Sequence, residues 1–336
     1  MSTRPKRQIL VVTTAALLAG IGRTVPAAEP SGGAPGMVWE RVGARSGQAL
    51  VLIPALGLKA NYWDRVYKNL ESAHPIYLGT LAGSAGTPPT TRPYFPRYIE
   101  AVRTLVEDEK LERPILFGHL LGAHIALRFA AEHPDLVGGV VAAPVIMVKP
   151  APEDRERVAE ETFRQYYDIS PDMWVPDLRI RIRKAVGDIE LVNWLTEMMV
   201  QSDQATYAGS VSEMIGDQIE EALPKIKVPV LMLAPFLLPY SLKDEEGRMP
   251  STGELISLQR DELRFGWPGI ARCDFETIKD SSIFMMLDQP DRTTRAIKRY
   301  LRKLKDSDSR WETSVIPPEE LARLRGAARE KQGASR

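Results

Sequence analysis

Residues 114–144, PILFGHLLGAHIALRFAAEHPDLVGGVVAAP, carry the pattern that most limits how this chain can fold. Apolar runs at both ends of the stretch enclose a helix-forming segment that starts directly after a turn containing Gly118 and Gly122. Short apolar runs bounded by turn residues are typical of buried strands, and two parallel strands need a crossover connection between them. The stretch therefore predicts a strand–turn–helix–strand unit, with Leu120 at the middle of the turn.

The same alternation extends along most of the chain and predicts an α/β fold with a mainly parallel sheet. Expected strands are residues 49–54, 74–79, 114–118, 136–144, 228–235 and 271–279, and expected helices include 61–72, 98–109, 123–134, 254–265 and 291–304. The alternation is interrupted at 145–223, which is charged and helical and rich in Trp, Tyr and Met. We expect this segment to lie over the sheet as a helical cap.

Composition excludes several classes of function. The chain has 336 residues, of which 44% are hydrophobic, and its 44 basic residues match its 44 acidic ones, so there is no electrostatic case for binding nucleic acid. The single cysteine, Cys273, allows no disulfide framework and no Cys-based metal site. Motifs for binding nucleotides or metals are also missing, so we expect neither a cofactor nor a metal.

The first 27 residues have the pattern of a secretory signal peptide. Arg4, Lys6 and Arg7 form a basic start, residues 9–22 are apolar, and small residues precede a cleavage point after Ala27. The apolar run is too short for a comfortable membrane span, so we expect export to the periplasm or the medium. Contact with a membrane is expected only if this segment stays uncleaved.

Four local motifs resemble those of the α/β-hydrolase superfamily, in the subgroup that carries a cap. They are IPALG at 53–57, TLAGSAGTPP at 80–89, GHLLG at 118–122 and SIFMMLDQP at 282–290. Their order and spacing fit the superfamily's oxyanion loop, glycine turn, nucleophile elbow and histidine segment. The resemblance implies a mostly parallel central sheet flanked by helices, with the cap inserted between strands six and seven of the family order.

The three catalytic positions implied by the resemblance carry apolar residues. The elbow position, where the family has its serine, is Leu120, and the histidine position is Ile283. The segment expected to supply the carboxylate reads Phe236, Leu237 and Leu238, with Leu237 at the triad-equivalent position. The triad is therefore interpreted as degenerate, because leucine and isoleucine hold no nucleophile or base.

Other residues are candidates for binding. The backbone N–H groups of Leu56 and Leu121 are expected to form an oxyanion-hole-like pair, because such donors do not depend on the side chain. The candidates for lining a pocket are Leu120, His119, Ile283, Phe284, Phe236, Leu237, Trp174 and Trp194. Structural roles are expected for the remaining histidines, for Cys273 as a buried thiol and for Ser84 in a glycine-rich turn.

These observations leave three functional hypotheses open. The first is an exported pseudo-hydrolase that binds a small apolar molecule or a protein partner in or over the cleft between cap and sheet. The second is a non-hydrolytic enzyme, such as a lyase or cyclase, in which the apolar pocket positions a reactive substrate. The third is an ester hydrolase with a displaced nucleophile.

The chain is expected to divide into consecutive segments: a signal peptide at 1–27, a flexible leader at 28–36, the first part of the core at 37–144, the cap at 145–223, the second part of the core at 224–304, and a charged tail at 305–336.

Overall fold

The computed structural model describes residues 36–144, 150–235 and 267–315. The expected signal peptide and most of the leader, the helix expected at 254–265 and the end of the tail lie outside these ranges, as do Phe236, Leu237 and Leu238. None of the helices in the described ranges combines the length and apolar character that a bilayer crossing requires.

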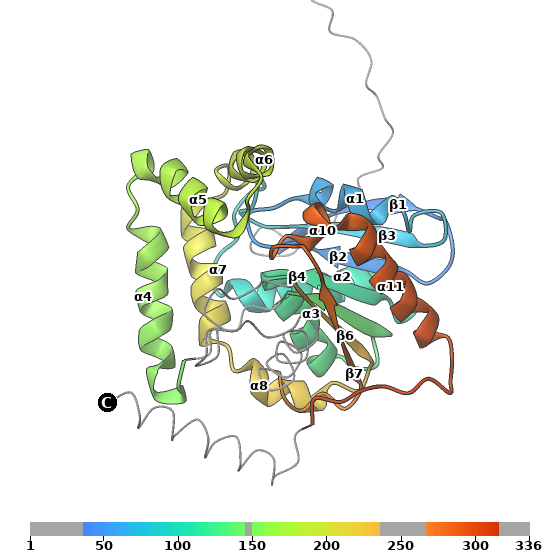
Figure 1. Cartoon of the computed structure of the whole chain (residues 1–336). Coiled ribbons are helices and arrows are strands. Elements are labelled where there is room, and N and C mark those ends of the chain that lie inside the picture. The colour runs from blue at the N-terminus through green and yellow to red at the C-terminus, as the bar shows by residue number, and fades with distance from the viewer. Residues whose placement is uncertain (1–35, 145–149, 236–266, 316–336) are drawn as a thin grey trace, which may run out of the picture.

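The described strands form one seven-stranded sheet in the order β1-β3-β2-β4-β5-β6-β7 (Figure 1). Only β1 is antiparallel to its neighbour, β3; the other pairs are parallel. The central strands are buried along their whole length, as expected for parallel strands covered on both faces. The strand bounds are β1 Met37–Gly43, β2 Leu50–Ile53, β3 Pro75–Leu81, β4 Ile115–His119, β5 Gly139–Ala143, β6 Val230–Pro235 and β7 Cys273–Ile278.

Helices flank this sheet and supply the rest of its core. The helix α2 (Tyr94–Asp108) packs on α3 (Leu121–Glu132), and α1 (Asp64–Tyr67) packs on α11 (Pro290–Leu304). The predicted helix at 61–72 is wrong in length, because only the 3-10 helix η1 (Ala60–Trp63) and α1 form, and residues 68–73 continue as turns. The turns are held by hydrogen bonds between residues three apart in the chain, such as the bond from the Leu70 N–H to the Tyr67 carbonyl.

A helical segment follows β5 and precedes β6, at the place where the sequence predicts a cap. It consists of η2 (Pro152–Asp154), α4 (Arg155–Tyr167), α5 (Pro171–Ala185), α6 (Ile189–Met199), α7 (Gln204–Gly216), α8 (Ile219–Ala222) and η3 (Leu223–Lys225). In Figure 1 the helices α4 to α7 gather beside one end of the sheet, where α4 packs on α7 and α5 on α6. The prediction placed the cap between strands six and seven of the superfamily's strand order. In the described residues the cap follows the fifth strand, one fewer than in that order.

Candidate functional site

The predicted elbow between β4 and α3 is confirmed in its geometry. Leu120 lies between the strand and the helix with φ 51° and ψ −112°, a conformation that costs a non-glycine residue on the order of 1–3 kcal/mol. The turn is closed by tight packing: a Cβ at Gly118 would lie 2.2 Å from the Gly122 carbonyl oxygen, and one at Gly122 would lie 2.1 Å from the Ile53 carbonyl oxygen. The spacing of the two glycines is therefore set by contact with neighbouring backbone.

Ile283 lies close to this elbow, in the loop between β7 and α10 (Met285–Asp288). The loop is closed by Asp288, whose carboxylate accepts hydrogen bonds from the backbone N–H of Ser282 at 2.7 Å and from its hydroxyl at 2.6 Å. The carbonyl of Ile283 accepts a hydrogen bond from Nε2 of His119 at 2.9 Å. These bonds fix the backbone of residue 283 and leave its side chain free to face the cap.

Leu120 and Ile283 line one cavity between the cap and the sheet, called the cap–core cavity below. Its volume is about 210 Å³, small beside the pockets of drug-sized ligands. No Ser, Thr, Cys, His, Asp or Glu occurs among the described residues that line it. The lining residues are Ala55, Leu56, Leu58, Leu120, Leu121, Ile283 and Phe284 from the core and Tyr166, Arg181, Ile182, Ala185, Met199, Tyr207, Val211 and Met214 from the cap.

The two residues expected to supply an oxyanion-hole-like pair of backbone N–H groups both come from the core. Leu56 and Leu121 both line the cavity, and within the described ranges neither N–H donates a recorded hydrogen bond. The loop that carries Leu56 is held by Ser84, a fully buried residue whose hydroxyl accepts a hydrogen bond from the N–H of Gly57 at 3.0 Å. Ser84 thus has the structural role expected for it.

His119 lies behind the cavity wall and is not among the residues that line it, although it was a candidate. Its side chain is fully buried, and this burial lowers its pKa to about 3, against the opposing effect of the hydrogen bond to the Ile283 carbonyl. The ring is therefore neutral, and Nε2 carries the proton because its partner is an acceptor. Nδ1 has no partner among the described residues, and the ring stacks on Tyr62 at 5.2 Å.

The other predicted pocket residues divide into two groups. Phe284 lines the cavity, whereas Trp174 lies behind Tyr207, with the two ring centres 5.6 Å apart, and Trp194 packs against the core without reaching the cavity. Two further cavity residues, Arg181 and Tyr207, were not predicted from the sequence. No sequence motif marks either of them.

The cap side of the cavity carries its polar groups. Nε of Arg181 donates a hydrogen bond to the carboxylate of Asp177 at 2.5 Å, and the guanidinium lies 4.5 Å from the centre of the Tyr166 ring. The rings of Tyr166 and Tyr207 are 5.4 Å apart. Burial raises the pKa of the Tyr207 hydroxyl, so this group stays protonated near neutral pH.

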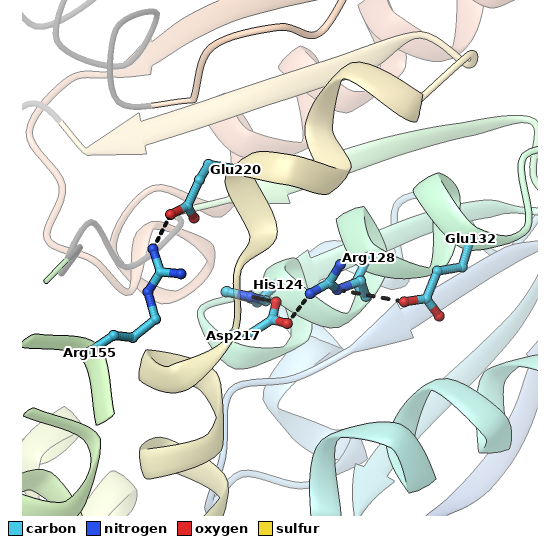
Figure 2. A network of polar contacts seen from close by, with 6 residues as sticks. All are labelled: His124, Arg128, Glu132, Arg155, Asp217 and Glu220. Carbon is cyan, nitrogen blue, oxygen red and sulfur yellow. Dashed lines mark hydrogen bonds and ion pairs between the residues drawn. The ribbon is translucent and has the colours of Figure 1, made fainter. Parts of the chain in front are cut away.

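A second polar cluster joins the end of the cap to the core and is separate from the cavity (Figure 2). Nε2 of His124 and an oxygen of Asp217 are 2.8 Å apart, and the other carboxylate oxygen pairs with Arg128. Burial opposes the charge of Asp217, but the hydrogen bonds from His124 and Arg128 lower the pKa of its carboxyl. The cluster therefore holds the end of α7 to α3, while Arg155 and Glu220 pair within the cap.

Neither a reactive cysteine nor a metal-binding cluster is found in the described part of the chain. Cys273 is buried, and burial raises the pKa of its thiol, which disfavours the reactive thiolate. No cluster of three or more His, Cys, Asp or Glu residues suited to a metal ion occurs in the described ranges.

A family model described as the alpha/beta hydrolase family matches residues 50–296 of the chain. Among curated proteins, an uncharacterized protein of Mycobacterium tuberculosis is 28% identical over 99 residues, which is 29% of each chain. The match thus spans well under half of that relative's length.

Solved structures match over much more of the chain. An esterase from Thermogutta terrifontis has a TM-score of 0.58 at 18% identity, covering 80% of this chain and 94% of that one. A putative epoxide hydrolase from Pseudomonas aeruginosa has a TM-score of 0.61 at 18% identity, covering 87% of this chain and 99% of that one. At these identities the likeness concerns the fold alone.

Proposed function

Because this chain belongs to the alpha/beta hydrolase family, we propose that it is a member without a working catalytic triad, which binds a small, largely apolar molecule in the cap–core cavity. The observation that carries the proposal is the lining of that cavity. Leu120 and Ile283 meet there, and no nucleophilic, basic or acidic side chain of the hydrolytic type lines it among the described residues.

The chemistry of acyl transfer explains why these replacements matter. A serine hydrolase needs a nucleophile, a base that takes its proton and a carboxylate that orients the base. Loss of such a triad costs on the order of 10⁶-fold in kcat, and the backbone donors of an oxyanion hole recover only a small part of it. His119 supplies no substitute base, because its protonated Nε2 is used by the Ile283 carbonyl.

The same replacements favour binding. Burial of apolar surface contributes about 2.5 kcal/mol for each 100 Å² removed from water, and this holds whether or not the ligand is later cleaved. The cavity presents Leu120, Ile283 and Phe284 on its core side, so a ligand seated there removes their side chains from water.

Active-site labelling tests the missing triad. We expect neither the wild-type protein nor Leu120→Ser to react with a fluorophosphonate probe or to hydrolyse p-nitrophenyl esters. The variant stays inactive because Ile283 offers no base to the new serine. Labelling of the wild-type protein at any residue would show that a displaced nucleophile exists and that the proposal is wrong.

Native mass spectrometry tests the ligand. The protein purified without detergent or solvent is expected to carry, or to bind on incubation with a small-molecule mixture, an apolar molecule. Ala185→Met places a longer side chain into the cavity and is expected to abolish this binding, whereas Arg183→Met on the exposed side of the same helix is expected to leave it unchanged. If both variants bind the molecule equally well, the ligand binds outside the cap–core cavity.

A non-hydrolytic enzyme is the second candidate, and the hydrogen-bond donors on the cap side of the cavity favour it. Arg181 and Tyr207 line the cavity opposite Leu120, where they can polarise an oxygen of a bound reactive substrate. Depletion of a candidate substrate by the wild-type protein, lost in Tyr207→Phe, would support this candidate over simple binding.

We also propose that the protein is exported, on the basis of the basic and apolar pattern of residues 1–27. Expression in a bacterium followed by cell fractionation and N-terminal sequencing tests this. A mature chain beginning after Ala27 in the exported fraction is the expected result, and an intact N-terminus in the cytoplasm contradicts it.

A further inference from the structure

The polar side chains among the described residues that line the cap–core cavity all come from the cap. Among the described residues that line it, Arg181 is the one with an ionised side chain, and Tyr166 and Tyr207 are the others with polar side chains. Asp177, which pairs with Arg181, does not line the cavity. The cavity therefore has a cation and hydroxyl-bearing side chains on its cap side, and apolar side chains on its core side.

The donors at that end are only partly used. Arginine has five N–H groups, of which Asp177 engages the one on Nε. The terminal N–H groups of Arg181 have no recorded acceptor within the described ranges, and the same holds for the Tyr207 hydroxyl. The Tyr166 ring lies 4.5 Å from the guanidinium and restricts how it can turn. Such a group is suited to an acceptor-only oxygen, because a guanidinium has no lone pair to offer.

We propose, on the basis of the ligand-binding function above, that the cap–core cavity takes a small apolar monocarboxylic acid as its anion. The carboxylate accepts hydrogen bonds from Arg181 and Tyr207, and the hydrocarbon part lies against Leu120 and Ile283. Hydrogen bonds between ionised partners are about twice as strong as neutral ones, and the planar guanidinium matches a carboxylate in shape.

The size of the cavity restricts the acid further. A cavity of about 150 Å³ lined by apolar side chains accommodates benzene. The cap–core cavity, with about 210 Å³, accommodates a single six-membered ring with one carboxylate. A phosphate monoester fits less well, because its two charges would meet a single cation among the described lining residues.

Isothermal titration calorimetry near neutral pH tests this assignment with a matched pair of probes, cyclohexanecarboxylate and its neutral isostere cyclohexanecarboxamide. We expect the carboxylate to bind the wild-type protein about tenfold more tightly than the amide. Arg181→Met keeps an unbranched apolar stem and removes the guanidinium, and it is expected to abolish that preference. Tyr207→Phe removes one hydroxyl and keeps the charge of Arg181, so it is expected to lower the affinity for the carboxylate a few-fold.

Arg179→Met is the matched control, because Arg179 lies on the same helix, is exposed and pairs with Asn193 outside the cavity. It is expected to keep the wild-type preference. Equal affinity for both probes in the wild-type protein would overturn this inference and leave the proposed function standing. If Arg179→Met and Arg181→Met lose the preference for the carboxylate equally, the inference is also overturned. The preference would then come from the general surface charge and not from the cavity. If neither probe binds, the inference is wrong, and the native mass spectrometry above decides the proposed function separately.

Discussion

The neutral, buried His119 makes the stability of this protein sensitive to mild acid. In the unfolded chain the histidine is expected to have an ordinary pKa near 6.5, whereas burial lowers its pKa in the folded protein to about 3. The folded state therefore binds fewer protons than the unfolded state between these values. Its stability is complete above about pH 6.5 and falls as the pH decreases toward about 3.

The size of this loss follows from the two pKa values. Between the two pKa values, each unit of pH lowers the free energy of unfolding by about 1.4 kcal/mol. Lowering the pH from about 7.5 to about 5 therefore costs about 2 kcal/mol of stability through this residue alone. The full difference between the two pKa values corresponds to about 5 kcal/mol, which is a large part of the stability of a typical domain.

Urea denaturation of the wild-type protein and of His119→Gln at these two pH values isolates the contribution. Glutamine keeps an amide N–H near the position of Nε2, so it preserves a donor for the Ile283 carbonyl and removes the titration. We expect the wild-type protein to lose about 2 kcal/mol more than His119→Gln between the two pH values. His133→Gln, a replacement at the C-terminal end of α3, is expected to behave as the wild type.

One result with His119→Gln would refute this reasoning. If His119→Gln loses as much stability as the wild-type protein between the two pH values, His119 is not held neutral. The lowered pKa attributed to its burial would then be wrong.

Two further predictions concern the cap attachment and the elbow. Asp217→Asn is expected to destabilise the protein by about 2 kcal/mol in thermal or urea unfolding, because buried donors of His124 and Arg128 lose a charged acceptor. Glu132→Gln, which breaks a half-exposed pair with Arg128, is expected to cost less than about 1 kcal/mol, and equal costs would contradict the role of Asp217 in holding α7 to α3. Gly122→Ala is expected to cost about 3 kcal/mol or to prevent folding, because its Cβ would lie 2.1 Å from a backbone oxygen. Gly187→Ala is the control, since no atom lies within 4 Å of its added Cβ, and comparable destabilisation by both would refute the packing argument.

The strands and the elbow were predictable from sequence because their signals are local. A buried parallel strand shows as an apolar run, and the turn shows as two glycines at fixed spacing, whatever the rest of the chain does. The positions of Leu120, Ile283 and Phe284 at one cavity followed from the order of four motifs. The structure places all three there.

The cap side of the cavity was not predictable in the same way, and α5 shows why. Hydrophobicity alone would turn Ile180 inward and Arg181 outward, but Ile180 is 55% exposed while Arg181 lines the cavity. The rotation of α5 about its axis is set by the packing of its buried residues, Trp174, Leu178 and Ile182. Hydrophobic periodicity does not distinguish these three from the apolar residues of α5 that are exposed. Trp174 was accordingly expected in the cavity and lies behind Tyr207 instead.

The hydrogen bond from His119 to residue 283 has a consequence for redesign. The contact uses the backbone carbonyl, and Asp288 closes the same loop through Ser282, so the position of the loop does not depend on which side chain stands at 283. The elbow likewise owes its shape to Gly118 and Gly122, and not to Leu120. Side-chain identity and backbone placement are thus uncoupled at both positions. A mutational path toward new chemistry at this site is accordingly short, since it requires exchanging side chains on a scaffold that already holds them in place.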